Sequence, residues 1–190
     1  MKYANIGRRM LLILALAAGL KATALAGAVS LGASAARFMP SSADFRNAYG
    51  GGFVPGFNLA FRIIGGLNIW AGGELYSKTG ELTYTGEEAK FKMTTLYAGL
   101  RLEATRSAVR PYLAGALGLV SYKEESVIGT VNGSDLGFLG QLGLLFRVSP
   151  NIFLELFGRY MQCKARPEQE TAVESEVGGL QAGAGLSLRF

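Results

Sequence analysis

The feature that most constrains this chain is a two-residue alternation of large apolar side chains with glycine and polar side chains. The pattern is clearest between residues 180 and 190. One set there is Leu180, Ala182, Ala184, Leu186, Leu188 and Phe190, and the other is Gln181, Gly183, Gly185, Ser187 and Arg189. A period of two belongs to a β-strand, whose successive side chains point to opposite sides, and not to a helix. The chain is therefore predicted to be all-β, with strands whose two faces differ in chemistry.

Eight stretches of about ten residues or more share this period and are predicted to be strands. They cover residues 28–38, 52–64, 67–77, 90–104, 110–123, 136–148, 151–164 and 177–190. Short turns alternate with longer polar segments along the chain. The short turns are 64–67, 105–109 and 149–151, and the longer segments are 39–51, 78–89, 124–135 and 165–176. This layout is typical of a transmembrane barrel, so we predict an eight-stranded antiparallel up-and-down transmembrane β-barrel.

The apolar face of each strand indicates what surrounds the barrel. In residues 52–64, Phe53, Phe57 and Phe61 oppose small or polar residues such as Gly56 and Asn58. An eight-stranded barrel is only just wide enough for its own side chains, so the small residues should point inward. The large apolar residues then point outward, which is stable only in lipid. The alternative is a secreted soluble barrel that binds a ligand inside, like a lipocalin, which would bury its phenylalanines and leucines in the lumen.

The carboxylates support the same assignment. Of the 14 acidic residues, 11 fall in the long polar segments, and the other three, Glu74, Glu103 and Glu155, fall on the small-residue face. Buried charges must be paired, so we predict an ion network that plugs the lumen, with a narrow gated pore as the functional alternative. The predicted members are Arg62, Glu74, Arg101, Glu103, Arg147, Glu155, Arg159 and Arg189.

The first 26 residues are predicted to be a cleavable signal peptide. A basic start precedes the uncharged run at residues 10–20, and Ala24 and Ala26 supply the small-x-small pattern of a cleavage site, with 22–24 as an alternative. The run is shorter than the roughly 20 residues of a membrane-spanning helix, although an N-terminal anchor is the other interpretation. Without the leader, the barrel domain at residues 27–190 has 15 basic and 14 acidic residues, a net charge of +1. This balance does not suggest a nucleic-acid partner.

Two absences limit the chemistry. The chain has no histidine, which is the commonest general base and metal ligand. Cys163 is the only cysteine, so a disulfide framework is excluded. We therefore predict no enzyme activity, cofactor or metal, and a lipid-A-modifying enzyme is disfavoured.

The last six residues, Gly-Leu-Ser-Leu-Arg-Phe, resemble the C-terminal signal that the barrel-assembly machinery reads, with Gly185, Leu188 and Phe190 at its key positions. Ala184 departs from the polar residue often found before that glycine. Residues 27–190 as a whole resemble the small outer-membrane β-barrel family of the OmpA/OmpX/opacity-protein type. The resemblance implies an integral monomer in a Gram-negative-type outer membrane, in contact with its lipid and lipopolysaccharide. Both termini would lie in the periplasm and the long loops outside.

The sequence thus favours a non-enzymatic outer-membrane protein that is structural or acts through surface contacts of its loops. The alternative is a narrow gated porin or transporter for small molecules, including apolar ones, which needs a hydrophobic pocket at the loop end. Arg37, Lys90 and Lys92 at the outer rim are hypothesised to meet lipopolysaccharide phosphates. A set of aromatic residues is predicted near the membrane interfaces. The set is Trp70, Tyr76, Tyr97, Tyr112, Tyr122 and Tyr160.

Overall fold

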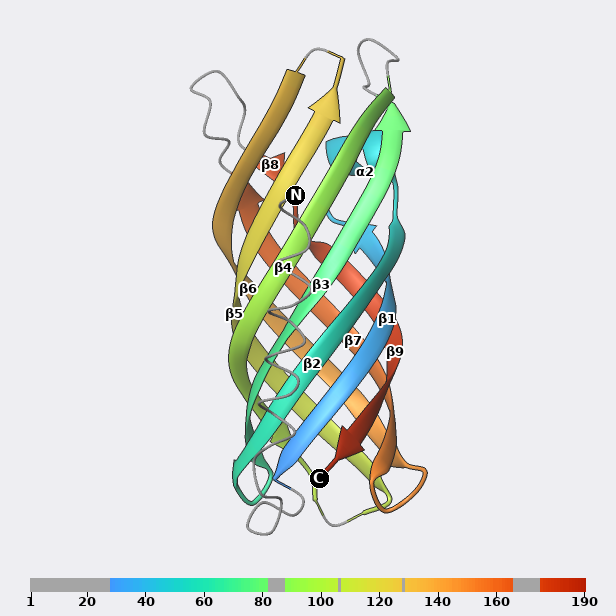
Figure 1. Cartoon of the computed structure of the whole chain (residues 1–190), viewed down its shortest axis with the longest axis vertical. Helices are drawn as coiled ribbons and strands as arrows, with labels where there is room; N and C mark the ends of the chain where they lie inside the picture. Colours follow the sequence, from blue (N-terminus) through green and yellow to red (C-terminus); the bar gives the residue numbers. More distant parts are fainter. Residues whose placement is uncertain (1–27, 82–87, 106, 128, 166–174) are drawn as a thin grey trace, which may run out of the picture.

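The computed structural model describes residues 28–81, 88–105, 107–127, 129–165 and 175–190 (Figure 1). Eight long antiparallel strands form a sheet that closes on itself, since each of them pairs with two neighbours and β1 pairs with β9. The long strands are β1 (Val29–Pro40), β2 (Gly52–Ile64), β3 (Leu67–Glu81), β4 (Glu88–Glu103), β5 (Val109–Ser126), β6 (Gly129–Arg147), β7 (Ile152–Ala165) and β9 (Gly179–Arg189). A short helix, α2 (Ala43–Tyr49), and a two-residue strand, β8 (Ser175–Glu176), lie at the loop end. The predicted all-β barrel is confirmed.

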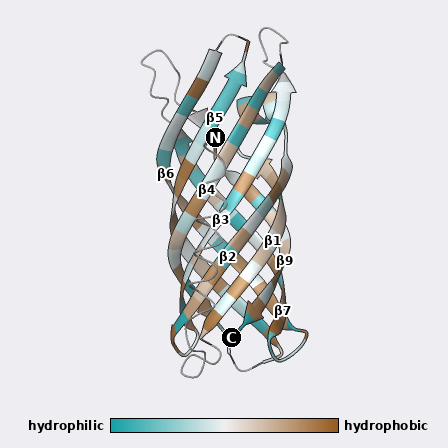
Figure 2. Ribbon diagram, in the orientation of Figure 1, coloured by the Kyte–Doolittle hydropathy of each residue, from teal (hydrophilic) through white to brown (hydrophobic). Residues whose placement is uncertain are grey.

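The outward face carries the large apolar side chains. Figure 2 shows the corresponding change between hydrophobic and hydrophilic residues along the strands. Phe57, Leu142 and Leu186 are 55%, 65% and 57% exposed on the outer wall. Arg101 and Glu155 lie inside and are almost fully buried. This arrangement confirms the prediction that apolar residues face lipid, and it contradicts the soluble lipocalin-like alternative.

The apolar belt has a height that fits a bilayer. On β5 the outward residues are apolar or glycine from Val109 to Leu119. Ten residue steps extend about 33 Å along a strand, and a tilt of about 40° leaves about 25 Å across the membrane. Above this level the outward residues of β5 become Ser121, Lys123 and Glu125. The last large outward apolar residues of β3, β4 and β6 are Leu75, Leu96 and Leu136, so four adjacent strands share one upper edge of the belt.

The strands continue beyond this edge, and the predicted loop at residues 124–135 is wrong. β5 and β6 remain paired as far as Ser126 and Gly129, which form the end of a long hairpin. The polar composition of this segment suggested a loop. Strands that have left the lipid need no apolar outward residues, so the belt pattern fades although backbone pairing continues.

The segment at residues 39–51, predicted to be a loop, contains the helix α2 instead. Ser42 caps the helix by accepting a hydrogen bond from the backbone N–H of Phe45 at 3.4 Å. Phe45 and Tyr49 point into the barrel mouth, where the Phe45 ring meets the Phe91 ring edge-to-face at 4.8 Å. They join a buried apolar cluster, here called the upper core. Its members are Phe38, Phe45, Tyr49, Val54, Tyr76, Ala89, Phe91, Met93, Val120, Tyr122, Met161, Cys163 and Val177.

The prediction that six aromatic residues lie near the membrane interfaces is wrong for five of them. Tyr160 is 40% exposed on the outer wall, but the others point inward and are buried. These are Trp70, Tyr76, Tyr97, Tyr112 and Tyr122. The reason is close approach to glycine: a Cβ added to Gly143, the cross-strand partner of Tyr112, would lie 2.6 Å from the tyrosine hydroxyl. Tyr97 and Tyr122 likewise lie over glycines on the neighbouring strand, Gly72 and Gly133, so missing side chains make room for phenol rings.

Candidate functional site

The lower lumen, at the short-turn end, centres on the carboxylate of Glu103. Arg189 binds it in bidentate fashion, with Nη1 3.0 Å from Oε1 and Nη2 3.0 Å from Oε2. Arg110 Nη1 lies 3.3 Å from Oε1 of the same carboxylate. The sequence reasoning did not include Arg110 in the lumen, although it shares the inward parity of Tyr112 on the same strand.

A second level of the lumen is built around Glu155. Arg101 Nη1 lies 3.5 Å from Glu155 Oε1, and the Tyr112 hydroxyl donates a hydrogen bond to the same oxygen. Gln141 Nε2 donates to the Tyr112 hydroxyl at 2.5 Å and to Glu155 Oε1 at 3.3 Å. Two strands on one side of the barrel, β4 and β5, are thereby connected to β6 and β7.

Arg159 organises the third level and is the most enclosed of the charged groups. It forms an ion pair with Glu74, which lies on β3 across the lumen, and both side chains are buried. Arg159 Nε donates to Gln141 Oε1 at 2.7 Å, which joins this level to the one below. Gln181 Nε2 donates to Glu74 Oε2 at 3.0 Å. Charged and amide side chains thus occupy the lumen at three successive levels, beneath the upper core. They share it with buried apolar side chains, such as Trp70, Leu139 and Phe157.

Two of the predicted network members contact no carboxylate within the part of the chain that the structure describes. Arg62 is half-buried and its Nε has no hydrogen-bond partner there. Arg147 is exposed at the short-turn rim and takes part in none of the ion pairs among described residues. Both line the lower end of the lumen, but the nearby acid, Glu103, already binds two other guanidinium groups.

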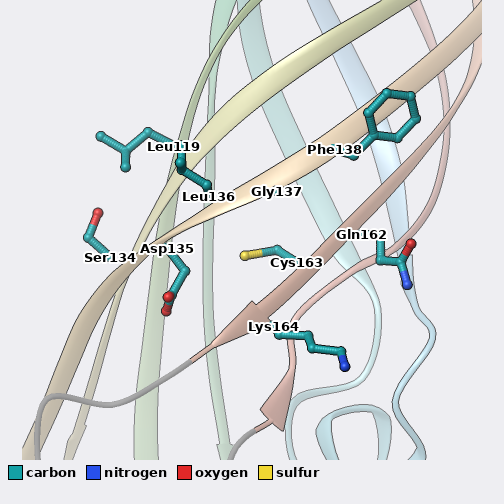
Figure 3. Close-up of a pocket in the computed structure, with 9 residues that line it drawn as sticks. All are labelled: Leu119, Ser134, Asp135, Leu136, Gly137, Phe138, Gln162, Cys163 and Lys164. Carbon is teal, nitrogen blue, oxygen red and sulfur yellow. The ribbon is translucent and has the colours of Figure 1, made fainter.

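A pocket lies at the loop end of the barrel, beside the last paired residues of β6 and β7. Their pairing ends at Gly137 and Cys163, after which β7 pairs with β8 instead. The pocket has a volume of about 600 Å³ (Figure 3). Leu136 and Phe138 line it from the outer wall, and Cys163, whose side chain belongs to the upper core, also contributes to its lining. The pocket is therefore a hollow of the outer wall, lined mainly by outward side chains, with the upper-core residue Cys163 at its edge.

The three cations predicted at the outer rim, Arg37, Lys90 and Lys92, do not lie together. Lys90 and Lys92 are exposed on the outer face of β4, and Lys92 is the cross-strand partner of Lys123 on β5. Arg37 is exposed on β1, separated from β4 by two strands. Sequence reasoning missed Lys123, which lies 2.5 Å from Glu125 and lowers the pKa of that exposed carboxyl by hydrogen bonding and by its charge.

The residues of the predicted assembly signal lie on and just after β9. Gly185 points inward opposite Ser34, while Leu188 and Phe190 are 47% and 53% exposed on the outer wall. Ala24 and Ala26 lie outside the described residues. Among the described residues, no group of three or more His, Cys, Asp or Glu side chains could hold a metal ion, and no helix is long and apolar enough to cross a membrane.

Comparisons with known proteins agree with this geometry. Residues 10–190 match the family model described as outer membrane protein beta-barrel domain. The crystal structure of Neisserial surface protein A is similar, with 22% identity, a TM-score of 0.68, and coverage of 85% of this chain and 97% of that one. OprG from Pseudomonas aeruginosa has 13% identity, a TM-score of 0.64 and coverage of 87% and 97%. The N-terminal β-barrel domain of Pseudomonas aeruginosa OprF has 12% identity, a TM-score of 0.58 and coverage of 87% and 98%. No curated protein sequence matches the chain.

Proposed function

Because the chain belongs to the outer membrane protein beta-barrel domain family, we propose that it is a non-enzymatic outer-membrane protein that acts through its loop-end surface. The family is one of integral proteins of the bacterial outer membrane. We propose further that both termini lie in the periplasm and that the loop end makes contacts outside the cell.

The observation that supports this function is the projection of β3, β4, β5 and β6 beyond the apolar belt. Their outward residues there are polar or charged, for example Thr79, Lys92, Lys123 and Asn132. Paired strands with a packed interior provide a rigid surface outside the membrane, which suits binding better than a loose loop does. The filled lumen beneath it favours a contact role over axial transport.

Cysteine labelling in intact cells tests the orientation. In a Cys163→Ser background, Thr130→Cys at the end of the β5–β6 hairpin should react with a membrane-impermeant maleimide. Asn151→Cys in the turn between β6 and β7 is the matched control and should react only after the outer membrane is broken. Both positions are exposed. The reverse pattern would refute the proposed orientation.

Lipopolysaccharide is the lipid proposed to contact the loop-end rim. Lys90, Lys92 and Lys123 lie together above the apolar belt and outnumber Glu125, which pairs with Lys123 among them, so phosphates of the outer leaflet would meet a net positive charge there. Purified barrel should resist urea better in vesicles that contain lipopolysaccharide than in phosphatidylcholine alone. Reversal of all three charges to Glu should abolish this difference, whereas Arg37→Glu, on the other side of the barrel, should retain it. Equal urea midpoints for the unmodified protein in both vesicles would exclude these lysines as a lipopolysaccharide site.

A second candidate function is the uptake of small apolar molecules through the wall. The pocket beside β6 and β7 supports it, because its lining includes both outward apolar side chains, such as Leu136 and Phe138, and Cys163 of the upper core. Under either function we expect no steady conductance in planar bilayers. Leu136→Trp should slow entry of an apolar fluorescent probe into the barrel if the pocket is the route, while Leu142→Trp, on the outer wall away from the pocket, should not. Equal entry rates for the two variants would exclude this route.

A further inference from the structure

The lumen ends at the short-turn side in a second pocket, of about 300 Å³. Four arginines from four different strands line it, namely Arg62 of β2, Arg110 of β5, Arg147 of β6 and Arg189 of β9. The short turns contribute Thr105 and Asn151 to the same lining. We call this set of arginines the lower arginine ring.

The charge of the lower arginine ring is only partly compensated. Glu103 is the carboxylate side chain that contacts it among the described residues, and its two oxygens are bound to Arg189 and Arg110. Arg62 Nε has no partner there and Arg147 joins no ion pair there. Phe190 also lines the pocket, and a terminal carboxylate at this residue would raise the negative charges to two against four positive ones.

The fold holds two of these four like charges, those of Arg110 and Arg189, close together. Phe153 lies inside the barrel, and the guanidinium carbons of Arg110 and Arg189 lie 4.9 Å and 4.5 Å from the centre of its ring. The bidentate contact with Glu103 fixes Arg189 further. Arg110 and Arg189 are thereby fixed at the pocket, while Arg62 is half-buried and Arg147 is exposed beside them. A bound anion would offset the positive charge that these four side chains concentrate there.

We propose that the lower arginine ring binds a phosphate-class oxyanion at the short-turn end of the lumen. A guanidinium group presents paired N–H donors that match phosphate oxygens. A tetrahedral anion can offer different oxygens to arginines that approach from different strands, whereas a carboxylate offers only two. The guanidinium groups of Arg147 and Arg62 are left for it, since both residues line the pocket and neither joins an ion pair among the described residues. Arg62 Nε is itself buried, so the terminal nitrogens of Arg62 would make the contact.

The phosphate group could come from a phospholipid headgroup of the adjacent leaflet or from a free phosphate in solution. That the pocket faces the periplasm rests on the proposed orientation. The binding itself does not, because it depends only on the four side chains. Labelling of Asn151→Cys tests the orientation and a binding titration tests the anion site, so either proposal can fail while the other stands.

The first test is calorimetric titration of inorganic pyrophosphate into the purified full-length barrel in zwitterionic micelles. We expect saturable binding that weakens as salt is added. Arg147→Gln and Arg62→Gln should each weaken it about tenfold or more, the effect of losing one hydrogen-bonded charge. Arg147→Lys, which keeps the charge but loses the paired donors, should fall between. Arg37→Gln removes one positive charge from the outer wall and should leave the affinity unchanged. Gel mobility before and after heating shows that each variant is folded.

The second test identifies the source of the phosphate. The urea midpoint of the barrel is compared in phosphatidylcholine vesicles with and without phosphatidylglycerol, for the unmodified protein and for Arg62→Gln/Arg147→Gln. If phosphatidylglycerol stabilises the unmodified protein but not the double variant, the bound phosphate belongs to a lipid headgroup. If pyrophosphate binds but phosphatidylglycerol does not stabilise the barrel, the ligand is a soluble phosphate. The proposal is overturned if neither probe has an effect, or if Arg37→Gln weakens pyrophosphate binding as much as Arg147→Gln does.

Discussion

The ion pair between Arg159 and Glu74 gives the sharpest prediction about stability. Arg159→Met keeps most of the side-chain volume but removes the ion pair and the hydrogen bond to Gln141. Glu74 then remains buried, with Gln181 as its hydrogen-bonding partner. Removing one member of a buried pair costs about 3–5 kcal/mol, because the remaining charge is uncompensated. We expect a loss of that size in the free energy of unfolding.

A double-mutant cycle separates this loss from packing effects. Glu74→Gln alone leaves the Arg159 charge buried, and the double variant Arg159→Met/Glu74→Gln buries no charge at this level. The double variant should therefore be more stable than Arg159→Met, with a coupling energy of at least about 1.5 kcal/mol. The measurement is urea unfolding in phosphatidylcholine vesicles, followed by the gel mobility of the folded barrel. Additive losses, with coupling below about 0.5 kcal/mol, would refute the claim that the two charges stabilise each other.

Three further predictions concern other parts of the barrel. Gly143→Val should destabilise the fold by about 1–3 kcal/mol, because its Cβ would lie 2.5 Å from the Leu156 backbone oxygen and 2.6 Å from the Tyr112 hydroxyl. Gly158→Val, with open space at the added Cβ, should be near neutral in the same urea assay. The buried thiol of Cys163 should react with maleimide far more slowly in the folded barrel than a Gln162→Cys thiol on the outer wall in a Cys163→Ser background. Burial, followed by the charge of a nearby glutamate, raises the pKa of Tyr49 above its ordinary 10.0, so folding favours the neutral phenol. The stability this provides is complete below pH 10 and lost as the pH rises further, and Tyr49→Phe should remove that part of the alkaline unfolding curve.

The position of the apolar belt was predictable from the sequence, because the alternation of side chains along a strand depends only on neighbouring residues of that strand. Phe57 and Asn58 fall on opposite faces of any strand that contains both, whatever its neighbours are. The lumen cations and acids followed from the same parity. Their partners did not, since the choice of Arg110 and Arg189 for Glu103 depends on how β4, β5 and β9 lie across the lumen.

The buried tyrosines show why register matters. Tyrosine suits both a membrane interface and a crowded interior, so residue type alone does not choose between them. The choice depends on which residue lies opposite, and Gly143 opposite Tyr112 makes room for the ring inside. Helix α2 was missed for a related reason. Seven residues form too short a helix to be stable alone, and its packing against Phe91 is a tertiary contact.

One physical change explains both the extended strands and the upper core. On lower β4 the outward residues are apolar, as at Leu100, while Arg101 points inward. On upper β4 the polarity is inverted, because Lys92 points outward and Phe91 points into the upper core. No residue is inserted between the two halves, so the parity of the strand is unchanged and only its surroundings differ. The lower half therefore follows the pattern of a lipid-exposed barrel, and the upper half that of a water-exposed one with an apolar centre. It follows that the loop end is held together by its own hydrophobic core, and that a contact surface there does not depend on the lipid for its shape.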